Sequence, residues 1–112
     1  MIEVKFTEKD GTITLEVKGH AEAAESGQDI ICSAASILGY TVAQIADNIY
    51  RRDGFEESPV IQLGHGNAMI QCKPKEVAAD ETRHTFFVAQ VGYELLAHNY
   101  PQFVSLTKFG EA

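Results

Sequence analysis

The chain has 112 residues, of which 45% are hydrophobic, so it is the size of a single domain that can close a core of its own. Its 16 acidic and 9 basic side chains give a net charge of −7, which disfavours binding to a nucleic-acid backbone and would attract a basic partner. Its apolar runs are too short for a membrane span or a secretion signal, and two cysteines are too few for a disulfide framework, which predicts a cytoplasmic protein.

The N-terminal segment has the pattern of a β-hairpin. Apolar and polar residues alternate over residues 2–7 and again over residues 13–18. Asp10-Gly11, between the two runs, is a strong signal for a tight turn. We therefore predict two antiparallel strands at the start of the chain.

After this hairpin the apolar spacing changes to every third or fourth residue, as in a helix. The helix is expected to have Asp29 as its N-cap, to continue from Ile31 and to end at residues 51–54, where a glycine follows a charged run. Its apolar face would consist of Ile31, Ala34, Ala35, Leu38, Val42, Ile45, Ala46 and Ile49.

Two more strands are predicted at residues 60–63 and 68–73, on either side of a glycine-containing turn. A second helix over residues 82–98 would end before Pro101, and a final run from 103 to 109 could add an edge strand. On one face this helix places Phe87, Val88, Val91, Leu95 and Leu96.

These elements predict an α+β fold with a mostly antiparallel sheet, in ββαββαβ order, packed against two long helices. The chain has no internal repeat, no low-complexity tract and no linker rich in Pro, Gly or Ser. We therefore expect residues 1–112 to form one domain.

The junction between the second strand and the first helix carries the candidate chemistry. If Asp29 is the N-cap, Cys32 lies in the first helical turn, where unpaired N–H groups and the helix dipole favour a thiolate. A helix end contributes only about 0.3–1 kcal/mol, so a reactive thiolate needs a second positive partner. His20 can supply it if the loop over residues 21–28, the expected moving part, folds back toward the helix.

In that arrangement the pair would catalyse acyl transfer. Cys32 would attack an acyl carbon, His20 would take the thiol proton and give it to the leaving amine, and first-turn N–H groups would stabilise the oxyanion. Asp29 could cap the helix or orient His20, and capping is favoured because one carboxylate can hardly do both.

Other interpretations of these residues stay open at this point. A cysteine early in an Ala- and Ile-rich helix is more often a small buried hydrophobe, and Cys72, in a strand, favours packing. Among the other histidines, His65 would be a solvated turn residue, and His84 and His98 would be surface or terminal residues of a helix. A metal site that combines His20, Cys32 and Cys72 with His65 or His84 matches no compact zinc spacing, so no metal or cofactor is predicted.

The segments 19–21 (Gly-His-Ala), 27–32 (Gly-x-Asp-Ile-Ile-Cys) and 34–36 (Ala-Ala-Ser) resemble the ribosomal-processing cysteine protease family, called Prp. The resemblance extends over the full chain. It implies an endopeptidase that removes a short N-terminal extension from a large-subunit ribosomal protein, the bacterial-type protein number twenty-seven. It also implies Cys32 as nucleophile, His20 as proton donor and acceptor, and a homodimer.

Gly19, Asp29 and Ser36 also match positions of the family motif and are expected to shape the site. Ser33 departs from the family, since a small apolar residue is more usual there, and the turn over residues 64–67 is not a recognised family feature. The alternative function is a non-catalytic, ribosome-associated binding module that grips a basic chain without cutting it.

Overall fold

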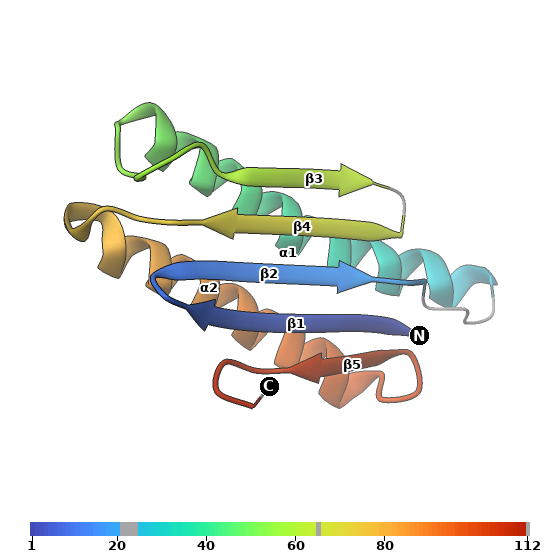
Figure 1. Ribbon diagram of the computed structural model, residues 1–112. Coiled ribbons are helices and arrows are strands. Elements are labelled where there is room, and N and C mark those ends of the chain that lie inside the picture. The colour runs from blue at the N-terminus through green and yellow to red at the C-terminus, as the bar shows by residue number, and fades with distance from the viewer. Residues whose placement is uncertain (21–24, 65, 112) are drawn as a thin grey trace.

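The computed structural model describes residues 1–20, 25–64 and 66–111, with side chains described for all of these except 25–29. The predicted ββαββαβ order is confirmed (Figure 1). The elements are β1 (Ile2–Lys9), β2 (Thr12–Lys18), α1 (Glu25–Arg51), β3 (Val60–Gly64), β4 (Asn67–Cys72), α2 (Glu76–Asn99) and β5 (Val104–Thr107).

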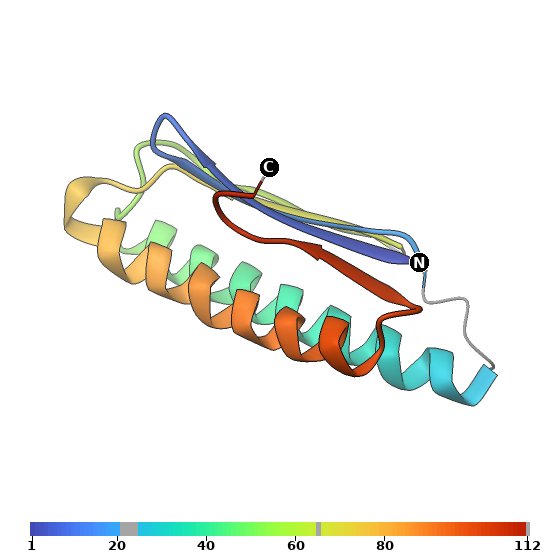
Figure 2. The same cartoon turned by 90° about the horizontal axis from the view of Figure 1, so that it is seen from below.

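The strands form one sheet in the order β3-β4-β2-β1-β5. The pairs β3–β4, β4–β2 and β2–β1 are antiparallel, and only β5 runs parallel to its neighbour β1. The prediction of a mostly antiparallel sheet is therefore confirmed. Figure 2 shows both helices side by side on one face of this sheet, so the structure has two layers.

The first hairpin turns where the sequence predicted. Asp10 and Gly11 have φ angles of 53° and 81°. Two successive residues with positive φ are the mark of a type I′ turn, whose twist matches that of the paired strands. The turn aligns Phe6 with Leu15 and Val4 with Val17, so the apolar residues of both strands lie on one side.

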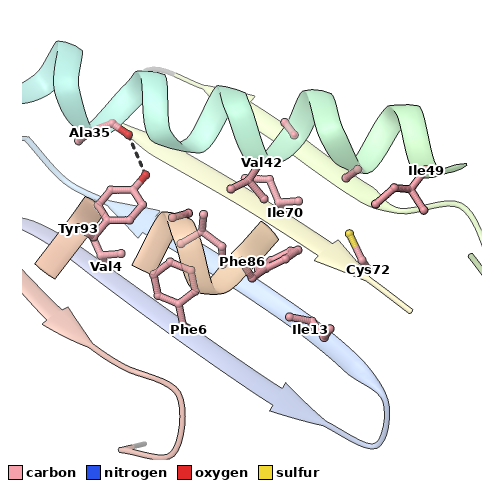
Figure 3. Close-up of a cluster of buried hydrophobic side chains, with 14 of the residues drawn as sticks. Val4, Phe6, Ile13, Ala35, Val42, Ile49, Ile70, Cys72, Phe86 and Tyr93 are labelled. Atoms are coloured by element: carbon pink, nitrogen blue, oxygen red, sulfur yellow. Dashed lines mark hydrogen bonds between the residues drawn. The ribbon is translucent and has the colours of Figure 1, made fainter. Parts of the chain in front are cut away.

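The core lies between this side of the sheet and the two helices (Figure 3). The expected apolar face of α1 is largely confirmed, because its buried residues recur every three or four positions and pack against the sheet. From the strands the core takes Ile2, Val4, Phe6, Ile13, Leu15, Ile70, Cys72 and Val104, and from α1 it takes Ile31, Ala35, Val42, Ala43, Ala46 and Ile49.

One stretch of α1, Ile30–Arg51, is by length and composition apolar enough to cross a membrane. One side of the stretch supplies core residues such as Val42 and Ile49, whereas Ile30 and Ile37 are exposed, and 33% of the window is buried.

The expected C-terminal end of α1 is confirmed, and its geometry explains Gly54. The N–H of Gly54 donates to the carbonyl of Ile49, and the N–H of Asp53 donates to that of Tyr50, both at 2.9 Å. This is the Schellman arrangement, with Asp53 in the left-handed conformation at φ 64°. A Cβ at position 54 would lie 2.5 Å from the Ile49 side chain, so only glycine fits there.

The expected start of α1 is wrong. The helix begins at Glu25, so Asp29 lies inside it and is not the N-cap. Residues 25–28, expected in the loop after His20, are helical, and the rest of that loop, 21–24, lies outside the described residues. The predicted start depended on the first strongly apolar residue, whereas a helix can extend beyond its apolar face.

Most of the expected apolar face of α2 is the outer one, whereas Leu96 packs against the core as expected. Phe87, Val88, Val91 and Leu95 are between 41% and 60% exposed. The helix instead packs through residues a turn apart on its other side, namely Ala78, Thr82, Phe86, Ala89, Gln90 and Tyr93. Both faces of α2 carry apolar residues, and small ones such as Ala89 let the buried face approach the sheet closely.

Candidate active site

A cavity of about 120 Å³ lies between α1 and the end of the sheet where β2 finishes and β4 begins. Gly19, His20, Cys32 and Ser36 all line it. The sequence had predicted these four residues for one site, and the fold brings them together from β2's end and from α1. Asp29 is the fifth predicted residue, and its side chain lies outside the described part of the chain.

The walls of the cavity are mostly apolar and small. Ala35 and Gly39 line it from α1, Ala68 lines it from β4, and the half-exposed ring of Tyr40 stands at its rim. Pockets with apolar walls and a few polar groups are typical of sites that bind an organic ligand. Here the polar groups include the candidate nucleophile and the candidate base.

His20 follows β2, and its backbone is held on two sides. The amino group of Met1 donates a 2.6 Å hydrogen bond to the carbonyl of His20. The N–H of Gly19 donates a 2.9 Å hydrogen bond to the carbonyl of Gly66 in the β3–β4 turn. Gly19 itself has φ 97°, and a Cβ there would collide with the carbonyl oxygen of Met1, which explains the glycine before His20.

Cys32 lies on α1, seven residues after its first residue Glu25, and is partly buried against the core. Its place in the first helical turn, expected from the sequence, is therefore wrong. The dipole effect fades beyond the first turn, and N–H groups two turns into a helix are already paired. Neither can stabilise a thiolate or an oxyanion at Cys32 as predicted, which leaves His20 as the candidate that activates the thiol.

Tyr93 joins α2 to the helix that carries Cys32, and the sequence-based prediction missed it. Its hydroxyl donates a 2.7 Å hydrogen bond to the carbonyl of Ala35 (Figure 3). Burial raises the pKa of Tyr93, so the hydroxyl remains a donor at neutral pH. Phe86, Ala89 and Tyr93 recur at helical spacing, and this pattern could have predicted the buried face of α2 from the sequence.

The other cysteine lies away from the cavity. Cys72 ends β4 opposite Ile13, four residues beyond the cavity-lining Ala68, which is roughly 13 Å along a strand. Burial raises the pKa of its thiol to about 12, in keeping with the expected packing role. The metal site that would join Cys72 to Cys32 is thus contradicted by the fold.

The two described histidines of α2 lie on its surface. His84 and His98 are exposed on α2, as expected, and His65 lies outside the described residues. Within the described ranges, no three His, Cys, Asp or Glu side chains gather in a way that could hold a metal ion.

Solved structures with the same fold include two of the essential ribosomal processing protease Prp from S. aureus. The complex with a covalently linked product peptide has a TM-score of 0.71 at 24% identity, and the complex with a substrate peptide has 0.63 at 23%. Each covers 96% of this chain and 99% of the other. SMU.848 from Streptococcus mutans has a TM-score of 0.69 at 24% identity, and the match covers 97% of this chain and 94% of SMU.848.

These TM-scores establish the shared fold. A comparison with curated proteins gave no match. The family model of the cysteine protease Prp matches residues 1–105, which is nearly the whole chain and includes every residue of the cavity. The chain therefore belongs to the cysteine protease Prp family.

Proposed function

We propose that this cysteine protease removes a short N-terminal extension from a large-subunit ribosomal protein, the bacterial-type protein number twenty-seven, in the cytoplasm. The observation that carries the proposal is the joint placement of Cys32 and His20 in one small apolar cavity. Family membership and the Prp complexes with peptides support this choice of substrate class. The net charge of −7 suits a basic substrate such as a ribosomal protein.

The proposed reaction proceeds through an acyl-enzyme. The Cys32 sulfur forms a bond to the scissile carbonyl carbon while the thiol proton passes to His20. The imidazolium then protonates the leaving amine as the C–N bond breaks. Water next attacks the thioester and gives a proton to His20, which returns it to the departing sulfur and restores the thiol.

The test uses a peptide that spans the extension and the first mature residues of the cognate ribosomal protein. Mass spectrometry should find one internal cut with the wild-type protein and none with Cys32→Ala or His20→Ala. Cys72→Ala is the matched control, since it removes the other thiol, and it should cleave as fast as the wild type. Equal cleavage by all four proteins would refute the assigned residues, and an uncut peptide that nonetheless binds would favour the non-catalytic binding module.

We also propose that the protein is a homodimer that associates through the outer face of α2. Phe87, Val88, Val91 and Leu95 form an exposed apolar stripe on this helix. Soluble proteins seldom leave such a contiguous apolar face in water, and a two-fold axis across one helix buries the same stripe of both copies.

Sedimentation analysis tests this association directly. Leu95→Glu should shift the protein to the mass of a monomer, whereas Tyr50→Glu, a control at an exposed aromatic of α1, should leave the mass unchanged. A wild-type protein that is monomeric at all accessible concentrations would contradict the proposal.

A further inference from the structure

We infer that Gly66, in the turn between β3 and β4, is a positioning residue for the imidazole of His20. The inference rests on the proposed function, in which His20 carries the proton. No motif in the sequence links the two residues, which are far apart in the chain and meet only in the folded protein.

The contact involves the imidazole ring itself. The three heavy atoms nearest to a Cβ built on Gly66 all belong to the His20 imidazole. They are Nε2, Cε1 at 2.5 Å and Cδ2 at 3.3 Å. Since real side chains do not approach so closely, the ring rests directly on the glycine backbone. Any side chain at this position would occupy the place of the imidazole.

The same turn also holds the backbone next to the ring. The N–H of Gly19 donates to the carbonyl of Gly66 at 2.9 Å, and the carbonyl of His20 accepts from the Met1 amino group at 2.6 Å. With the backbone tied down on both sides, His20 cannot retreat from a new methyl group as a unit. The ring would have to rotate, which moves Nε2 relative to Cys32.

Such a rotation would affect proton transfer more than peptide binding. A general base must come within about 2.6–3.2 Å of the proton that it removes. A misplacement of roughly 1 Å can lower a rate by about 10²-fold. We therefore expect Gly66→Ala to lower kcat by about 10²-fold, with a much smaller change in KM.

Gly66 also has a φ of 75°, so an alanine there is strained by its backbone as well as by the ring. Gly11→Ala separates the two effects. Gly11 has a similar φ of 81°, but a Cβ on it would meet no atom within 4 Å. Gly66→Asn is the second variant, because asparagine tolerates the left-handed conformation and still carries a Cβ.

The experiment measures peptide cleavage across pH for the wild type, Gly66→Ala, Gly66→Asn and Gly11→Ala, together with the NMR shifts of the His20 imidazole. Both Gly66 variants should lose kcat, change the pH–rate profile and shift the ring signals. Gly11→Ala should lose stability but keep the wild-type kcat and profile.

Two results would overturn the inference. One is a Gly66→Ala protein whose kcat lies within twofold of that of Gly11→Ala. The other is a kcat that recovers fully in Gly66→Asn, because backbone strain would then be the whole effect. His20→Ala distinguishes the failure of the proposed function: if that variant cleaves like the wild type, both ideas fall, whereas an inactive His20→Ala beside a fully active Gly66→Ala removes the inference alone.

Discussion

Removing one oxygen atom, in Tyr93→Phe, should destabilise the protein measurably. The ring of Tyr93 is 0% exposed, and its hydroxyl donates a 2.7 Å hydrogen bond to the carbonyl of Ala35. Phenylalanine fills the same space without the hydroxyl, so the change isolates this hydrogen bond from the packing of the ring.

The magnitude follows from the loss of one buried hydrogen bond. Such a bond contributes about 1 kcal/mol net, and a buried group left unpaired costs about 1–3 kcal/mol. The carbonyl of Ala35 keeps its helical partner, the N–H of Gly39 four residues later, so the loss stays in the lower part of this range. We expect a loss of about 1–2 kcal/mol, which corresponds to roughly 4–8 °C in Tm for a domain of this size.

The assay is thermal and urea unfolding followed by circular dichroism, with hydrogen exchange at the Gly39 amide as a local measure. Tyr40→Phe is the matched control, because Tyr40 lies on α1 with 51% of its surface exposed and should change stability by no more than about 0.5 kcal/mol. In Tyr93→Phe the Gly39 amide should also exchange faster. Equal stability of the two variants, with unchanged exchange, would refute the assigned role of the hydroxyl.

Three further predictions concern the cysteines and one helix end. In native protein near neutral pH, iodoacetamide should modify Cys32 much faster than Cys72, whose pKa is raised to about 12 by burial, and similar rates for both thiols would count against a shielded Cys72. Since the unfolded thiol titrates near 9.0 and the folded one near 12, the folded state loses stability as pH rises between these values. The loss should be up to about 1.4 kcal/mol per pH unit steeper in wild type than in Cys72→Ala, and parallel urea-unfolding profiles would disprove it. Gly54→Ala should cost about 1–3 kcal/mol, because its methyl group would overlap the Ile49 side chain 2.5 Å away, and urea unfolding at the wild-type midpoint would contradict this.

Much of the fold could be predicted from local pattern. The alternation in β1 and β2 and the Asp10-Gly11 turn identified the first hairpin, because both signals come from residues that are neighbours in the chain. The end of α1 was equally predictable, since Asp53 suits the left-handed position of a Schellman motif and Gly54 suits the close-packed position after it. His20 and Cys32 were named as candidates through the resemblance of the motif around them to the Prp family, although the expected place of Cys32 at the helix start was wrong.

The wrong predictions arose where two patterns compete. On α2 the larger apolar residues, such as Phe87 and Leu95, lie outside, while the buried face has Thr82 and Tyr93 among its residues. Size and hydrophobicity pointed to the wrong face, because packing against a sheet depends on fit as much as on apolar area. The start of α1 was misplaced because polar residues before the apolar face can also be helical.

The sequence by itself thus predicted the order of the elements and the hairpins, which depend on contacts between near neighbours, and its resemblance to a family named the two candidate catalytic residues. Only the tertiary structure decided that Cys32 lies two turns inside its helix, that Tyr93 of α2 donates a hydrogen bond to that helix, and that Gly66 lies against the imidazole of His20. These contacts join residues that are distant in the chain, and their energies come from shape and hydrogen bonding between surfaces that only folding brings together.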